Sequence, residues 1–319
     1  MLTNLNEVVK LIEAGNWLHL SGNEDLLKKL PRGNWIGGST EYFMDKTGGA
    51  VTNEKLFVQE IPYTACKIAA YNEKTIQNIT EDAYPNGFSI IILPFDSEVH
   101  KTYAKNAAGF KEIFLKNIIG WVSGTNLSVP GQTPITVNGQ TGEVSSCKAV
   151  VLHVSLPDDK LANIGIINIF TQNENSPMIE FSENSFTVQK CLVNGQEVVF
   201  SEYLAKNNID TKLPIIGEYS GTGVNVSVKQ IDGNTVSLYA PVFEGIKYRF
   251  ANPITDYASA FKTQLEGISE NPVFTCNCIL NFLYGELEGK QIQSLFGPIT
   301  FGEVAYQLVN QTLVYLSVY

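Results

Sequence analysis

The closing stretch of the chain, residues 297–319, constrains the fold more than any other segment. Its last part, residues 309–319, is dense in β-branched and aromatic residues, alternates polar and apolar positions, and ends without a polar tail. This pattern is typical of a strand inside a sheet, because such side chains pack well on a pleated surface. Chain ends are usually loose, so the pattern predicts a buried hairpin whose terminal strand is fixed in a sheet.

One charged residue, Glu303, follows Gly302 within this apolar stretch. A carboxylate that is withdrawn from water needs a hydrogen-bond donor or a ligand amine to offset its desolvation. We therefore take Gly302 and Glu303 as candidate ligand-binding residues. The alternative is a glutamate that faces water at a strand end, with Gly302 marking a β-bulge.

The length and composition of the chain predict its architecture. A chain of 319 residues is longer than one ordinary compact core, and 44% hydrophobic with 17% charged residues indicates a globular protein. Polar turn formers cluster at residues 172–177, so we expect domains at residues 1–175 and 176–319. The expected fold class is α+β, with two domains of mixed β-sheets flanked by helices in sandwich-like layers.

The charge and the cysteine content indicate which partners and which compartment to expect. The net charge is −10 and the lysines are scattered, so neither nucleic acid nor an anionic membrane is an expected partner. No apolar run is long enough to span a membrane, and the N-terminus lacks the pattern of a secretion signal. The 5 cysteines are an odd number, which favours reduced thiols. We therefore expect a cytoplasmic protein.

A second candidate site lies in the N-terminal half, where an apolar strand breaks into small residues at residues 37–40. Glycines at such a corner let a ligand or a neighbouring strand approach the backbone closely. Residues 121–125 echo residues 35–39, although chance explains so short an echo as well as a paired site does. The turn-rich residues 128–145 form either a hairpin or a lid over this corner. The candidate ligand-binding residues here are Gly37, Gly38, Ser39 and Thr40.

The usual catalytic and metal motifs are absent from the sequence. No nucleophile elbow, P-loop or dinucleotide-binding motif is present. The pair Cys276 and Cys278 is a weak metal signal, because zinc is usually held by four ligands in spaced pairs. Buried packing is the main interpretation of these thiols, and a hydrolase that pairs Cys276 with His19 or His153 is the alternative. We expect no metal and no cofactor.

Several of these segments resemble FIST domains. Thr275-Cys276, Phe301-Gly302-Glu303 and Asn310-Gln311-Thr312 are similar to the closing pattern of the FIST C-terminal domain. Residues 37–40 resemble the Gly-x-Ser-Thr corner of the FIST N-terminal domain. The family continues that corner with Gly-Glu, whereas this chain has Glu41-Tyr42, so Glu41 either takes over the role of the family's glutamate or does not.

The resemblance implies a bacterial sensory module that binds a small ligand, with amino acids as the usual suggestion. It predicts a stand-alone ligand-binding protein of signal transduction, whose ligand is an amino acid or a related small polar metabolite and whose signalling partner is a separate protein. The ligand is expected between residues 37–40 and the strand bearing Glu303, with Cys276 also at the site and with domain closure on binding. Replacing Glu303 with Gln is then expected to weaken binding without unfolding. The alternatives are a Cys- or Glu-dependent enzyme and a protein-binding scaffold.

Overall fold

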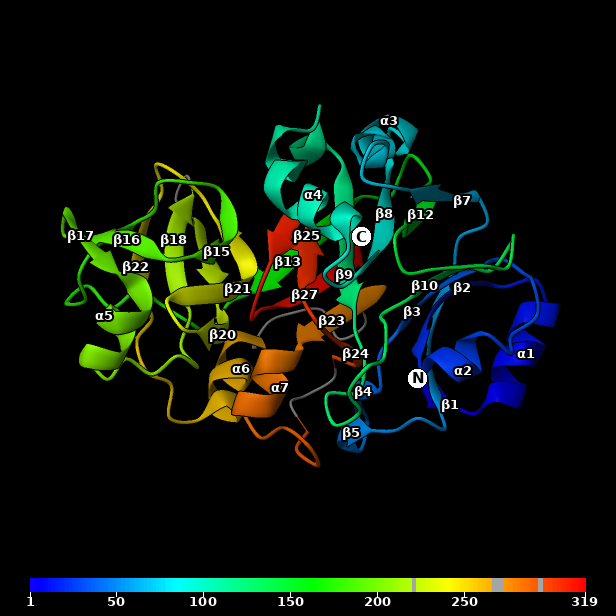
Figure 1. The fold of residues 1–319 in the computed structure, drawn as a ribbon. Coiled ribbons are helices and arrows are strands. Elements are labelled where there is room, and N and C mark those ends of the chain that lie inside the picture. Colours follow the sequence, from blue (N-terminus) through cyan, green and yellow to red (C-terminus); the bar gives the residue numbers. More distant parts are fainter. Residues whose placement is uncertain (220–221, 266–271, 292–294) are drawn as a thin grey trace.

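The computed structural model describes residues 1–219, 222–265, 272–291 and 295–319. Within these residues the chain forms seven α-helices and several mixed sheets, with 42% of residues in strands and 19% in helices. The predicted class of mixed sheets flanked by helices is therefore confirmed. Figure 1 shows the N-terminal strands and the strands from β14 to β22 on opposite sides of central sheets that contain the C-terminus.

The N-terminal sheet carries the first candidate corner. Its six strands follow the order β1 (Leu2–Thr3), β6 (Leu56–Ile61), β2 (Trp17–Gly22), β3 (Trp35–Ser39), β10 (Thr136–Asn138) and β11 (Glu143–Ser145). β2 and β3 are parallel, and the other neighbours are antiparallel. Helices α1 (Leu5–Glu13) and α2 (Glu24–Leu27) begin after Asn4 and Asn23, whose side chains accept hydrogen bonds from backbone N–H groups of the first turn. α2 therefore starts directly at the end of β2.

The central sheet has the order β26 (Gln307–Val309), β25 (Glu303–Ala305), β9 (Asn117–Ser123), β8 (Gly87–Pro94), β12 (Ala149–Ser155) and β7 (Cys66–Tyr71). β8 and β9 are parallel, and β8 is buried along its whole length, as its continuous apolar run predicts. Helix α4 (Glu98–Asn106) packs on β8 and β26, and the short helix α3 (Ile79–Asp82) precedes β8.

The third sheet holds the end of the chain. Its order is β13 (Ala162–Ile167), β27 (Leu313–Val318), β23 (Phe274–Cys278), β24 (Gly297–Thr300), β4 (Tyr42–Asp45) and β5 (Gly48–Val51). The terminal strand β27 lies between β13 and β23, so the prediction of a C-terminal strand buried in a sheet is confirmed. Helix α7 (Ile279–Tyr284) follows β23 directly. The closing stretch is not a single hairpin, because β25 and β26 pair with each other in the central sheet while β24 and β27 belong to this one.

Two further sheets and two helices complete the described chain. One sheet has the order β17 (Gln196–Val199), β16 (Lys190–Val193), β14 (Ile179–Glu180), β22 (Lys247–Phe250), β18 (Ile215–Tyr219) and β19 (Thr222–Val226), and the other has β15 (Ser185–Val188), β21 (Thr235–Val242) and β20 (Val228–Asp232). The helices are α5 (Phe200–Lys206) and α6 (Tyr257–Leu265). All these elements come after residue 175, whereas β23 to β27 pair partly with β4, β9 and β13 from earlier in the chain. The two domain ranges remain a prediction.

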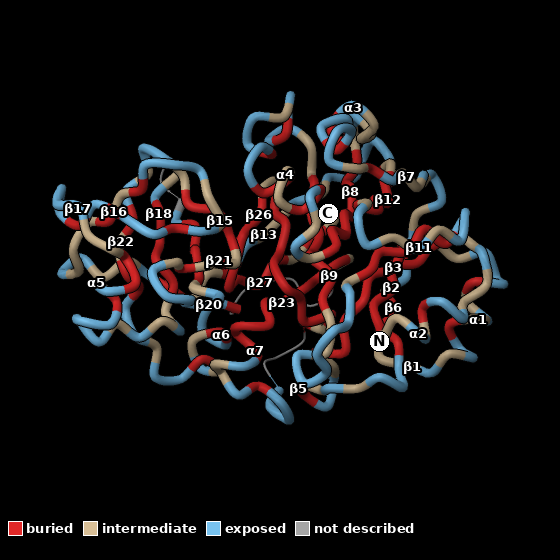
Figure 2. Tube along the Cα trace, viewed as in Figure 1, coloured by how far each residue is buried: buried red, intermediate tan, exposed pale blue. Residues whose placement is uncertain are grey.

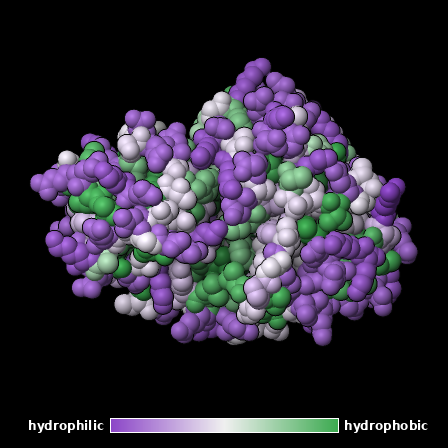
Figure 3. Space-filling model, in the orientation of Figure 1, coloured by the Kyte–Doolittle hydropathy of each residue, from purple (hydrophilic) through white to green (hydrophobic). Residues whose placement is uncertain are grey.

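Buried residues run through the strands at the centre of the molecule, and the loops at its periphery are exposed (Figure 2). On the face drawn in Figure 3, hydrophilic residues cover most of the surface, and hydrophobic residues gather mainly in a hollowed band near its centre. In the described part of the chain, no helix has both the length and the apolar character needed to cross a membrane.

Candidate functional site

The predicted corner at the end of β3 and its echo at the end of β9 lie against each other. The hydroxyl of Ser39 donates to the carbonyl oxygen of Gly124 at 2.8 Å, and the backbone N–H of Gly124 donates to the carbonyl oxygen of Ser39 at 2.8 Å. The backbone N–H of Ile135 donates to the Ser39 hydroxyl at 2.9 Å. The two similar sequence segments therefore form one paired corner, and Ser39 holds it together.

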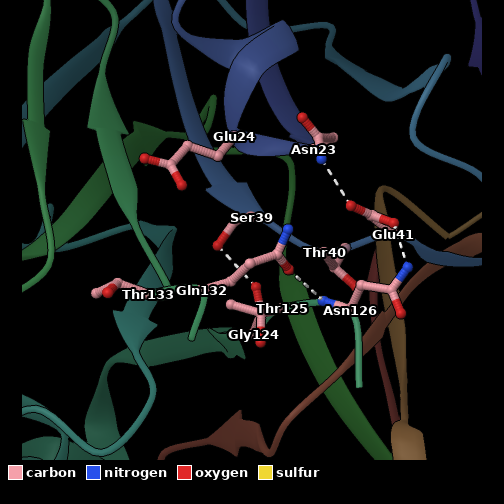
Figure 4. Close-up of a pocket in the computed structure, with 10 residues that line it drawn as sticks. All are labelled: Asn23, Glu24, Ser39, Thr40, Glu41, Gly124, Thr125, Asn126, Gln132 and Thr133. Carbon is pink, nitrogen blue, oxygen red and sulfur yellow. Dashed lines mark hydrogen bonds between the residues drawn. The ribbon is translucent and has the colours of Figure 1, made fainter. Parts of the chain in front are cut away.

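A small hollow of about 230 Å³, counting its open mouth, lies at this junction (Figure 4). Every residue that lines it is polar or a glycine. The lining residues are Asn23, Glu24, Ser39, Thr40, Glu41, Gly124, Thr125, Asn126, Gln132 and Thr133. Gln132 and Thr133 come from the turn-rich excursion, which covers the corner and then continues as the hairpin of β10 and β11. The hollow is therefore enclosed by segments that are far apart in the sequence.

The position of the hollow follows from the strand order. β2 and β3 run parallel, so their carboxyl ends lie at the same edge of the N-terminal sheet, and the carboxyl end of β9 reaches the same place through the Ser39–Gly124 bonds. In sheets with parallel strands, ligands bind preferentially outside the carboxyl ends of the strands. The hollow lies at that end.

The most unusual group in the lining is the carboxylate of Glu41, whose residue is only 5% exposed. It accepts one hydrogen bond from Nδ2 of Asn23 and one from Nδ2 of Asn126, each at 2.6 Å (Figure 4). Oδ1 of Asn23 caps helix α2, and Oδ1 of Asn126 accepts from the backbone N–H of Ser128. Glu41 therefore ties the start of α2 to the loop after β9.

Two of the four predicted corner residues do not line the hollow. Gly37 and Gly38 are buried within β3. A Cβ atom on Gly38 would lie 2.6 Å from the side chain of Ile92 and 2.8 Å from that of Trp121, so this glycine permits close packing against the central sheet. Thr40 does line the hollow, and its hydroxyl donates to the carbonyl oxygen of Ile299 in β24 at 2.8 Å.

Glu303 lies in the core and does not line the hollow. It is fully buried, and its Oε1 is hydrogen-bonded to the hydroxyl of Thr300 at 3.0 Å. Oε2 accepts from the backbone N–H and the hydroxyl of Thr312 at 3.2 and 2.9 Å. Burial raises the pKa of Glu303 from an ordinary value of 4.5 to about 8, and the threonine bonds offset only part of this effect. Gly302 has a φ of +147°, which favours glycine, and its carbonyl oxygen accepts from Val122 N at 2.8 Å.

The cysteine pair is also internal. Cys276 and Cys278 are buried, and desolvation raises the pKa of both thiols well above the ordinary value. Cys276 lies next to a separate internal space between β23 and β24. His19 accepts from the indole N–H of Trp121, and the ring of His153 is bonded to Ser89 and Tyr71. Neither ring is hydrogen-bonded to Cys276 in the described residues. These residues also contain no group of three or more His, Cys, Asp or Glu that could hold a metal.

Of the predicted corner residues, Ser39 and Thr40 line the hollow, and so does Glu41, whose role the sequence left open. The sequence patterns did not bring Asn23, Asn126, Gln132 and Thr133 together with them. Asn23 was recognisable as a helix cap, and Asn126 follows the echo segment, so both stood in places where polar side chains leave a strand.

The fold and the hollow together define a mixed α/β protein with a polar site at the carboxyl ends of its strands. Residues 3–319 match DUF6976, a family of unknown function, and the chain belongs to that family. The same comparison finds no FIST domain, so the predicted FIST membership is wrong. The motifs behind that prediction are short, and most of them lie at strand ends, where unrelated sheets need similar small and polar residues. No curated protein and no solved structure matches the chain.

Proposed function

We propose that this protein binds a small polar molecule in the hollow between residues 39–41 and 124–126. The observation that supports this function is the convergence of three strand ends on a hollow lined only by polar residues and glycine. A polar hollow at this position offers hydrogen-bond groups with fixed orientations, which is what a small ligand site requires.

The size of the hollow limits the ligand. The space inside the mouth is only about 20 Å³, far below the roughly 300–1,000 Å³ of common ligand pockets. The ligand is therefore a small amino acid or a related polar metabolite that places one small polar group in this space. A larger ligand requires movement of the segment that carries Gln132 and Thr133, both of which are exposed.

The proposal keeps the sensory role, with a separate protein as signalling partner. All lining residues fall within residues 1–175, and Thr40 connects them to β24 through its bond to Ile299. A movement of the corner on ligand binding would reach β24 through this connection. All five cysteines are free thiols, which supports a cytoplasmic location as part of the proposal.

The test is a thermal-shift screen against amino acids, small carboxylates, small amines and nucleotides, followed by calorimetry on any hit. Thr125→Val removes a hydroxyl from the lining at nearly constant volume, and Thr64→Val makes the same change at an exposed position outside the lining. We expect a saturable shift of the wild-type protein, weaker binding by the Thr125 variant and unchanged binding by the Thr64 variant. A flat screen, with a working positive control, would contradict the proposed function.

A further inference from the structure

We propose that the ligand of this hollow carries an ammonium group that binds Glu41, so that a cationic ligand is preferred over a zwitterion or a neutral molecule of the same size. This inference rests on the proposed function and names the class of its ligand. It differs from the sequence-based expectation, in which Glu303 was to pair with the amine.

The Glu41 carboxylate is buried and lacks a charged partner among the described residues. The residue is only 5% exposed, and no lysine, arginine or histidine of the described residues forms a salt bridge with it. Its two hydrogen bonds come from neutral amides, which are dipoles and do not cancel a full charge. A buried charge is costly unless it is paired, so an ammonium group in the hollow would complete a site that the chain leaves unpaired.

The Glu41 carboxylate can accept more hydrogen bonds than it does. A carboxylate offers about four lone-pair sites, and the amides of Asn23 and Asn126 occupy one on each oxygen. Each oxygen can therefore accept a further hydrogen bond. An ammonium group supplies three donors and no acceptor, and hydrogen bonds between charged partners are the strong ones.

The charge around the hollow also favours a cationic ligand. Its lining contains two carboxylates and no cationic side chain. Glu24 lies across the hollow from Glu41 in Figure 4 and forms a salt bridge with Lys28, which leaves Glu41 as the uncompensated charge. A ligand carboxylate would find no cationic side chain in this lining. An ammonium group would instead lie close to the Glu41 carboxylate, where water screens the attraction less.

The experiment uses three probes of nearly equal size and different charge: glycinamide, glycine and acetamide. Calorimetry at pH 7 on the full-length protein is expected to show the highest affinity for glycinamide, a lower affinity for glycine and the lowest affinity for acetamide. Added sodium chloride is expected to weaken glycinamide binding more than acetamide binding, because only the first involves charge. This ranking needs no variant, so it does not depend on how a mutation affects folding.

Glu41→Gln is expected to lower the affinity for glycinamide about 10-fold or more, with little effect on acetamide. Glu54→Gln, at an exposed position outside the lining, is the matched control. Asn23→Ala keeps the charge and removes one of the two amide bonds, so it is expected to retain the preference for glycinamide. Circular dichroism and the unfolding midpoint show whether each variant is folded.

Three results would overturn the inference. Equal or tighter binding of glycine, or a Glu41 variant that binds glycinamide like the Glu54 control, removes the ammonium preference while the proposed function stands. Binding of none of the three probes also overturns the inference, and it contradicts the proposed function only if the broader thermal-shift screen is flat as well.

Discussion

Replacing Glu303 with Gln is expected to make the protein more stable at pH 8 relative to the wild type, and to have little such effect at pH 5. The reason is that the fully buried carboxyl is held in its neutral form. Its pKa is raised by burial from 4.5 to about 8. No lysine, arginine or histidine of the described residues forms a salt bridge with it. Glutamine has nearly the same shape and no proton to lose.

The local geometry agrees with a neutral Glu303. The hydroxyl of Thr300 lies 3.0 Å from Oε1 of Glu303 and 3.2 Å from the carbonyl oxygen of Asn277. A hydroxyl has one proton and a carbonyl oxygen can only accept. A protonated Glu303 can therefore donate to Thr300 while Thr300 donates to Asn277, and an ionised Glu303 would compete for the same proton. The side-chain amide that the Glu303→Gln substitution introduces can make the same donation.

The magnitude follows from linkage between protonation and folding. Below pH 4.5 the carboxyl is protonated in both the folded and the unfolded chain, so it does not change the free energy of unfolding. Between 4.5 and about 8 only the unfolded chain loses the proton, and the free energy of unfolding falls as the pH rises. At 1.36 kcal/mol per pKa unit, the full loss is about 5 kcal/mol, an upper value of which most falls between pH 5 and 8.

The assay is urea unfolding of the wild type and the variant at pH 5, 6, 7 and 8, with Glu73→Gln at an exposed position as control. The three buried histidines have lowered pKa values, so they lower the stability of both proteins as the pH falls below about 6.5. The difference between the two proteins is therefore the test. The difference in the free energy of unfolding should grow by several kcal/mol toward pH 8. Curves of this free energy against pH that run parallel for the two proteins would refute the reasoning.

Two further predictions concern packing and thiol reactivity. Gly38→Ala should lower the free energy of unfolding by about 1–3 kcal/mol, because its Cβ would lie 2.6 Å from Ile92. In the control Gly109→Ala the new Cβ meets nothing within 4 Å, so the free energy of unfolding should change little. Equal denaturation curves for the two variants would contradict this prediction. A mild thiol reagent should label the exposed Cys147 in the native protein and leave Cys276 unmodified until unfolding, as followed by peptide mass spectrometry. Rapid labelling of Cys276 would instead favour the cysteine-enzyme alternative.

Local patterns predicted the strands better than they predicted the site. The apolar run of β8 and the β-branched and aromatic residues of β27 specify buried strands, because residue type acts locally. Whether a glutamate faces a hollow or the core depends on pairings across the chain. Glu303 is buried because β25 lies between β9 and β26, and Glu41 reaches the hollow because the loop after β9 folds back onto β3. No local pattern carries that information.

The same reasoning explains why the closing motifs suggested a known family. Phe301-Gly302-Glu303 and Asn310-Gln311-Thr312 are nine residues apart in the chain, and Thr312 donates two hydrogen bonds to Glu303. The two motifs thus form one hydrogen-bonded pair. Thr312, next to the start of β27, donates to the carboxyl of Glu303 at the start of β25. Any sheet that buries a neutral glutamate in this way gains from such a pair, since an unsatisfied buried carboxyl is costly. The motif pair therefore indicates how the chain end is stabilised, and the predicted response of Glu303→Gln to pH tests that role directly, independent of any ligand.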